Sequence, residues 1–127
     1  MSENTPDNAH LLIVEDDPVA RSILEQLCKQ NKYDYVSAID GDEAVDIARK
    51  QSFDLMITDI NMPNLDGISC VRQVRAMKKH RSVPVIALTG LDDFFIEDEC
   101  SRVGVNKIVS KPVNPNEILA SIKELLI

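Results

Sequence analysis

The 127-residue sequence has no apolar run near 18 residues, the length that a membrane-crossing helix needs. Positive charge is also scarce, because 14 lysine and arginine residues stand against 21 aspartate and glutamate residues, a net charge of -7. No basic stripe offsets this excess, so we expect neither nucleic acid nor an anionic membrane as a direct partner. The opening stretch 2–9 is polar and lacks the charged-then-apolar pattern of a leader peptide. We expect residues 1–9 to form a flexible arm.

Cysteine is also infrequent, with only Cys28, Cys70 and Cys100 in the chain. The three are widely separated, odd in number and without a CxxC pair, which argues against a disulfide framework or a zinc site. We expect each thiol to be a small core residue of a cytosolic protein, and we therefore expect the chain to be cytoplasmic.

Short apolar runs alternate with helix-length periodic segments, a pattern that predicts βαβ units and a parallel sheet in an α/β fold. Each strand of such a sheet is buried on both sides, which explains why several runs lack alternation. The length favours one domain, over residues 10–127. We expect five strands, each followed by a helix, near residues 11–14, 33–39, 54–58, 83–89 and 107–110.

Start signals mark several of the expected helices. Asp17 precedes Pro18 and Asn114 precedes Pro115, in both cases an N-cap residue before a proline at the first helical position. Asp40 has a glutamate three residues later, the spacing of a capping box. These signals place helix starts directly after the first, second and fifth expected strands.

Histidine occurs twice, at His10 beside the polar arm and at His80 within the basic cluster of Lys78, Lys79 and Arg81. Neither imidazole has a nucleophile in its local context that would suggest acid–base chemistry. We expect both side chains to be exposed to solvent.

Three acidic residues and one lysine fall where apolar runs end: Glu15 and Asp16, Asp59, and Lys111. The carboxyl ends of parallel strands open onto one crevice, so we expect these four side chains to meet. Clustered carboxylates repel one another by a few kcal/mol at an effective dielectric constant of about 20, which favours a bound cation. Oxygen ligands that can retain water fit Mg²⁺ better than zinc.

Each of these residues also has an ordinary structural interpretation. Asp16 and Asp17 both stand where a carboxylate can cap the first helix, and Asp17 is expected to do so. Lys111 could be a surface lysine, although Pro112 after it restricts its backbone to extended conformations. Thr89 ends the fourth apolar run, and a β-branched residue closing a strand is ordinary. The four ends taken together favour a functional crevice.

The segments around these residues resemble the receiver domain of bacterial two-component response regulators. The resemblance covers residues 10–127 and implies a flavodoxin-like, doubly wound five-stranded sheet of order 2-1-3-4-5 with five helices. The matching segments are residues 12–18 with the acidic pair, 54–63 followed by Asp66-Gly67 around the phosphoaccepting aspartate, 87–90 with the threonine, and 110–112 with the lysine.

The resemblance implies that Asp59 accepts a phosphoryl group from a phosphohistidine on a histidine kinase or a histidine phosphotransfer domain. It implies Mg²⁺ as the cofactor, held by Asp16, Asp59 and the backbone carbonyl of Asn61, with Glu15 acting through water. Lys111 would pair with Asp59 and later with the phosphoryl group. Such a chain is a phosphoacceptor that assists its own phosphorylation and dephosphorylation, and is not an enzyme.

The resemblance also implies a switch toward a downstream effector protein, in which the Thr89 hydroxyl moves to the phosphoryl group. The family often has an aromatic residue three positions before the lysine, and this sequence has Ile108 there. Two outcomes stay open: a smaller aliphatic shift that signals, or onward transfer of the phosphoryl group with little surface change. The chain could be a free-standing regulator or the receiver of a larger protein.

Two other functions remain as alternatives. An aspartyl-phosphate phosphatase would need a second aspartate two residues after the nucleophile, where this sequence has Asn61. A docking domain that works without phosphorylation would normally have lost some acidic or lysine residues, and Glu15, Asp16, Asp59 and Lys111 are all present.

Overall fold

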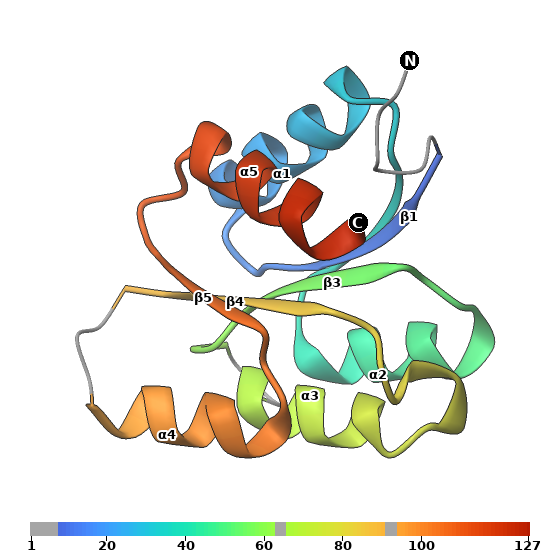
Figure 1. Cartoon of the computed structure of the whole chain (residues 1–127), viewed down its shortest axis with the longest axis vertical. Helices are drawn as coiled ribbons and strands as arrows, with labels where there is room; N and C mark the ends of the chain where they lie inside the picture. Colours follow the sequence, from blue (N-terminus) through green and yellow to red (C-terminus); the bar gives the residue numbers. More distant parts are fainter. Residues whose placement is uncertain (1–7, 63–65, 91–93) are drawn as a thin grey trace.

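The five strands of the protein form one parallel sheet in the order β2-β1-β3-β4-β5 (Figure 1). The computed structural model describes residues 8–62, 66–90 and 94–127. The strands are β1 (His10–Val14), β2 (Asp34–Ala38), β3 (Leu55–Asp59), β4 (Val85–Thr89) and β5 (Lys107–Ser110). The predicted strand order and the parallel sheet are confirmed, and each strand end lies within two residues of its predicted position. One of these shifts makes Asp59 the last residue of β3.

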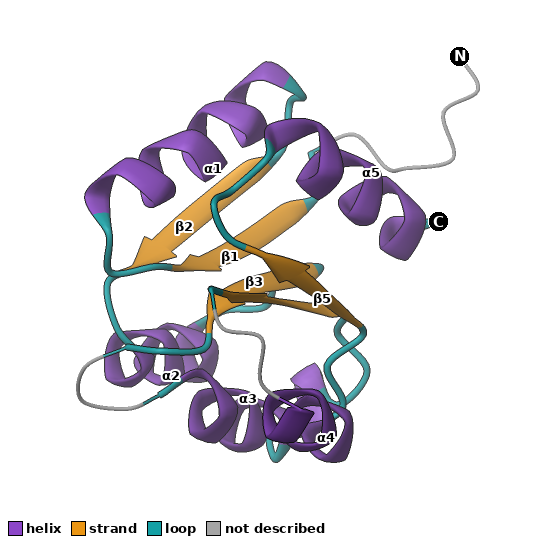
Figure 2. Ribbon diagram, turned by 90° about the vertical axis from the view of Figure 1, so that its left-hand side faces the viewer, coloured by secondary structure: helices purple, strands orange, loops and turns teal. Residues whose placement is uncertain are grey.

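Helices cover both faces of the sheet, as a doubly wound fold requires. In Figure 2, α1 and α5 lie on one face, and α2, α3 and α4 lie on the other. The bounds are α1 (Pro18–Gln30), α2 (Gly41–Lys50), α3 (Gly67–Arg75), the 3-10 helix η1 (Lys78–His80), α4 (Phe94–Val103) and α5 (Pro115–Leu126). Within the described ranges, none of the helices is long and apolar enough to cross a membrane.

The helix starts follow the signals in the sequence. The Asp17 carboxylate accepts a hydrogen bond from the backbone N–H of Ala20 at 2.9 Å, and Asp40 accepts one from Glu43 at 2.9 Å. The Asn114 carboxamide oxygen accepts from the residues two and three positions later. The three predicted N-caps are therefore confirmed, and they fix where the chain turns back from each strand end.

Alternate residues of the central strands pack on opposite layers of helices. Leu11 and Ile13 belong to the cluster with the buried faces of α1 and α5. Leu12 and Val14 belong to the cluster with α2 and α3. All four side chains have no exposed surface, which explains why β1 reads as a continuous apolar run.

The cysteines are core residues, as predicted. Cys28, Cys70 and Cys100 are buried and none forms a disulfide. Burial raises the pKa of the Cys28 and Cys70 thiols to about 12, so both stay protonated at neutral pH.

The prediction that both histidines are solvated is wrong. His80 has no exposed surface, because η1 turns its ring inward. The ring stacks on Phe53 with a centroid distance of 4.2 Å and an angle of 15° between planes. Its Nε2 lies 2.9 Å from the carbonyl oxygen of Ala48 in α2. His10 is half-buried, with Nε2 2.9 Å from Oε1 of Gln51.

Asn8 and Ala9, which belong to the expected N-terminal arm, are attached to the fold. The Asn8 N–H donates to the carbonyl of Lys32 at 3.2 Å, and the Ala9 carbonyl accepts from the N–H of Asp34 at 2.9 Å. Ala9 is also part of the core cluster on the α1 and α5 face. The rest of the expected arm, residues 1–7, lies outside the described residues.

His80→Ala should lower the free energy of unfolding by about 3 kcal/mol, because it leaves a cavity beside Phe53 and removes a partner of the Ala48 carbonyl. Lys78→Ala, an exposed substitution two residues away, should change it by no more than about 0.5 kcal/mol. Urea unfolding of both variants measures the difference. Equal effects would show that the His80 ring is exposed in solution.

Candidate functional site

The carboxyl ends of three strands bring the predicted site residues to one edge of the sheet. Glu15 follows β1, Asp59 ends β3, and Lys111 follows β5. The strand register aligns these ends, because β1 and β3 pair through Val14 and Thr58, one residue before each acid. The buried apolar strands therefore determine the position of the charged residues that follow them.

One ammonium group joins two buried carboxylates. Lys111 Nζ lies 2.9 Å from Oδ2 of Asp59, and 3.0 and 3.2 Å from Oε1 and Oε2 of Glu15. Asp59 is 4% exposed and Glu15 has no exposed surface, whereas a quarter of the Lys111 side chain is exposed (25%). The predicted meeting of Lys111 with the acidic residues is confirmed.

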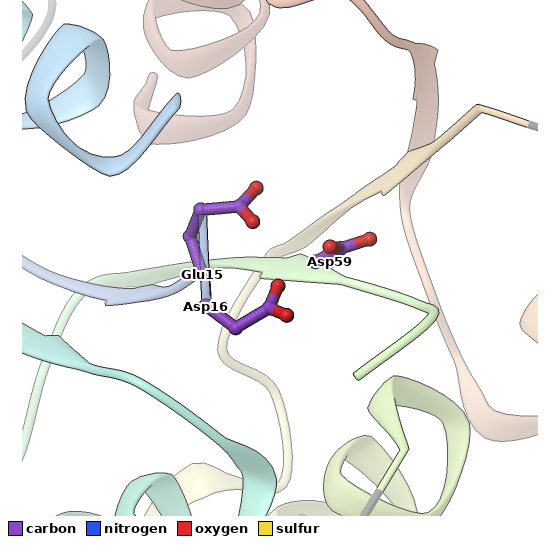
Figure 3. Close-up of side chains that lie close together, drawn as sticks. All are labelled: Glu15, Asp16 and Asp59. Carbon is purple, nitrogen blue, oxygen red and sulfur yellow. The ribbon is translucent and has the colours of Figure 1, made fainter. Parts of the chain in front are cut away.

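Asp16 completes the acidic cluster from the solvent side. Figure 3 shows the Glu15 and Asp16 carboxylates directed toward Asp59. One oxygen from each of Glu15, Asp16 and Asp59 can be chosen so that all three atoms lie within 4.8 Å of one another. Glu15 and Asp59 are buried and Asp16 is exposed, so a ligand in this cluster would contact both protein and water.

Burial is the main cause of the pKa shift of Glu15, whereas at Lys111 the neighbouring carboxylates outweigh it. Burial raises the pKa of Glu15 from its ordinary 4.5 to about 7, although hydrogen bonds from the Asp17 N–H and from Lys111 lower it. Burial by itself would lower the pKa of Lys111, but the hydrogen bonds and charges of Asp59 and Glu15 raise it. Lys111 is therefore held in its charged form.

The cluster fits a hard divalent cation. Three carboxylates face one ammonium group, so the ionised site has an excess of negative charge. Within the described part of the chain, Glu15 Oε1 is buried and accepts no hydrogen bond, although it lies in the ion pair with Lys111. Oxygen donors alone, some of them open to water, are the donor set that Mg²⁺ prefers.

The other predicted residues lie around this cluster. Thr89 ends β4 at 5% exposure, and its carbonyl accepts from the Lys111 N–H at 2.8 Å. The Asn61 N–H donates to Oδ1 of Asp59 at 3.3 Å. Ile108 packs on the apolar cluster that includes Ile60, the residue after Asp59, and Cys100 of α4.

Two residues with close contacts at the site had no predicted role. Gly67 donates its N–H to the carbonyl of Ile60 at 2.9 Å, and a Cβ at this position would collide with the carbonyl oxygen of Asp59. Arg21 Nη1 donates to the carbonyls of Glu15 at 2.9 Å and Asp16 at 3.4 Å. The glycine after Asp66 and a basic residue one turn into α1 were the available sequence signals.

Comparison with known proteins agrees with this geometry. Residues 11–123 match the family described as the response regulator receiver domain. The chain belongs to this family. Receiver domains are the phosphoacceptors of two-component signalling systems and are not classical enzymes. Because the match spans nearly all of the sheet and the acidic cluster, it covers every residue of the candidate site.

The similar sequences and structures belong to proteins of several kinds. PhoP, the alkaline phosphatase synthesis transcriptional regulatory protein of Bacillus subtilis, is 31% identical over 119 residues, 94% of this chain and 49% of PhoP. The chain spans about half the length of the first curated relatives it matches. The receiver domain of sensor histidine kinase PA1611 from Pseudomonas aeruginosa, with a magnesium ion coordinated in its active site cleft, has a TM-score of 0.86 and 31% identity, covering 94% of this chain and 98% of that one.

A third relative is solved with a partner protein. It comes from the co-crystal structure of the histidine phosphotransfer protein Ypd1 and the receiver domain of its downstream response regulator Ssk1, from Saccharomyces cerevisiae. The TM-score is 0.86 at 28% identity, and the alignment covers 96% of this chain and 90% of the solved chain. The receiver fold therefore occurs in transcriptional regulators, in sensor kinases and in phosphotransfer complexes.

Glu15→Gln should change how the stability of the metal-free protein depends on pH. Because the folded-state pKa of Glu15 is raised to about 7, the protonated group stabilises the wild type fully below pH 4.5, and this stabilisation is lost as the pH rises through 7. Glutamine does not titrate, so the variant does not lose this stabilisation as the pH rises. Its free energy of unfolding relative to wild type should therefore rise by about 3 kcal/mol between pH 4.5 and pH 8.

Urea unfolding in the presence of a chelator, at four or five pH values, measures this difference. Glu97→Gln, which neutralises an exposed acidic residue of α4, is the matched control and should give a flat difference. A flat difference for Glu15→Gln as well would mean that Lys111 keeps Glu15 ionised throughout.

Proposed function

We propose that this chain accepts a phosphoryl group on Asp59 from a phosphohistidine donor, with Mg²⁺ as cofactor. The observation that carries the proposal is the contact between Asp59 Oδ2 and Lys111 Nζ at 2.9 Å, beside two further carboxylates. A nucleophilic carboxylate, a fixed cation and a metal-binding acidic pair are the groups that phosphoryl transfer to an aspartate needs.

In the proposed reaction, an Oδ atom of Asp59 attacks phosphorus in line with the leaving group. A P–O bond to Asp59 forms and the P–N bond of the phosphohistidine breaks. The imidazole leaves with the electron pair and takes a proton from water. Lys111 Nζ, which pairs with Asp59 beforehand, pairs with a phosphoryl oxygen afterward.

The residues that would hold Mg²⁺ are Asp16, Asp59 and the backbone carbonyl of Asn61, with Glu15 acting through water. When bound, Mg²⁺ neutralises charge on the transferring oxygens. The Asn61 N–H contact to Oδ1 of Asp59, 3.3 Å long, orients the nucleophile independently of the metal. The magnesium ion in the related PA1611 receiver domain supports this assignment.

Phosphorylation of Asp59 would change the protein surface through movements of Thr89 and Ile108. We propose that the Thr89 hydroxyl moves to hydrogen-bond the phosphoryl group, since Thr89 ends the strand next to β3. Ile108 on β5 pairs with Ala87 of β4 and packs on the apolar cluster that Ile96 and Cys100 of α4 line. An aliphatic shift of Ile108 against α4 would then change the surface presented to a downstream effector.

The phosphohistidine donor is proposed to dock beside α1. A groove next to Lys111 is lined by Val19 and Ile23 of α1 and by Pro112, and Val19 is 69% exposed. An apolar surface that borders Lys111, the ion-pair partner of Asp59, suits a helical domain that presents a phosphohistidine. The complex of Ypd1 with a related receiver domain supports a phosphotransfer protein as the partner.

Incubation with Mg²⁺ and acetyl phosphate should add one phosphoryl group to the wild type, because the small donor needs no docking surface. The acyl phosphate should be lost at alkaline pH. Intact-protein mass spectrometry measures the mass, and Asp59→Asn should stay unlabelled. Labelling of both proteins to the same extent would remove Asp59 from its proposed role.

Asp16→Asn should weaken Mg²⁺ binding far more than Asp17→Asn. Only Asp16 belongs to the acidic cluster, whereas the Asp17 side chain caps α1, and asparagine caps a helix about as well as aspartate. The two variants have the same charge and alter adjacent residues, so each is the control for the other. Calorimetric titration with Mg²⁺ compares them, and similar losses of affinity would show that both carboxylates contribute to the metal site.

A further inference from the structure

Arg21 binds the backbone of the acidic loop and not its side chains. Its Nη1 donates to the carbonyl oxygens of Glu15 and Asp16 at 2.9 and 3.4 Å, and its backbone N–H donates to the carbonyl of Asp17 at 2.9 Å. No ion pair within the described ranges includes Arg21. One residue of α1 thus contacts three successive carbonyls of the loop.

The remaining contacts of this loop run in other directions. The Glu15 N–H donates to the carbonyl of Ala38 in β2 at 3.0 Å, and the Asp17 N–H donates to Glu15 Oε2 at 3.1 Å. Among the residues that the structure describes, Arg21 supplies the side-chain hydrogen bonds to the backbone carbonyl oxygens of Glu15 and Asp16. The orientation of these peptide groups sets the direction in which the Glu15 and Asp16 side chains leave the backbone.

We propose that Arg21 is a positioning residue of the metal site, which it serves by fixing the Glu15 and Asp16 peptide groups. The inference rests on the proposed function, because it assigns to Arg21 a part in the binding of Mg²⁺. Arg21 would act through the two acidic residues, because a guanidinium has no acceptor atom that could ligate a metal ion. An arginine can do this because Nη1 alone carries two N–H donors and so can bind two carbonyls at once.

The direction in which the Kd for Mg²⁺ changes when Arg21 is removed distinguishes a positioning role from a purely electrostatic one. A cation near a Mg²⁺ site repels the metal, so if Arg21 acted only through its charge, its removal would tighten Mg²⁺ binding. If Arg21 positions the acidic residues, its removal weakens binding instead. Partners that orient metal ligands from outside the coordination shell typically contribute 10- to 100-fold to metal affinity, which is larger than the opposing charge effect at a partly exposed site.

Calorimetric titration with Mg²⁺ alone at about 0.15 M salt, the physiological range, tests the proposal. Arg21→Gln should raise the Kd for Mg²⁺ about 10-fold. Arg21→Lys keeps the charge but replaces the planar guanidinium by a compact ammonium on a flexible stem, so its Kd should lie between wild type and Arg21→Gln. Lys29→Gln removes an exposed cation from the same helix and should leave the Kd unchanged or slightly lower.

Loss of folding gives a different result, because unfolded molecules lower the number of sites per chain and leave the Kd of the folded ones unchanged. An Arg21→Gln Kd equal to or below that of wild type overturns the proposal, as does an equal rise for Lys29→Gln. A wild type that binds no Mg²⁺ overturns the proposed function together with this inference. In a wild type that binds, an unchanged variant overturns this inference alone.

Labelling of Asp59 by acetyl phosphate provides a second measurement. In Arg21→Gln, a higher concentration of Mg²⁺ should restore the rate, because only the occupancy of the metal site is reduced. A rate that stays low at saturating Mg²⁺ would show that Arg21 acts on the transfer step and would overturn the proposed route through the acidic pair.

Discussion

The ion pair of Lys111 with Asp59 and Glu15 is the interaction on which the candidate site depends. Two carboxylates with almost no exposed surface share a single ammonium group, and removing it would leave buried charge without compensation, which costs several kcal/mol. The backbone holds Lys111 in place, since its N–H donates to the Thr89 carbonyl at 2.8 Å. The sheet therefore fixes the charge balance of the crevice through the end of β5.

The same edge of the sheet depends on close backbone contacts. Gly67 lies so near the Asp59 carbonyl that no side chain fits between them, and Arg21 binds the carbonyls of Glu15 and Asp16. Both contacts hold the chain where a strand ends and the loop that carries the acidic residues begins. A site built from strand ends needs such supports, because the β ladder stops at the residues whose side chains must be placed best.

The sequence allowed the site to be predicted because its residues follow buried apolar strands. Their positions at the strand ends predict that Glu15, Asp59 and Lys111 lie together, whereas the strand order is implied only by the family resemblance. Contacts to backbone atoms, such as those of Arg21, leave no periodic pattern in a sequence and were missed. His80 was misjudged because a three-residue 3-10 helix is too short to show which side is buried, and its charged neighbours suggested exposure.

Phosphorylation under the proposed function would change the charge balance that Lys111 maintains. A phosphoryl group carries about two negative charges at neutral pH, so Asp59 would attract Lys111 more strongly than before. Glu15, with no exposed surface, would then share less of that ammonium group. A bound cation or a proton would then compensate its buried carboxylate. Under the proposed function, the charges at Asp59 and Glu15 are thus coupled through the one lysine that follows β5.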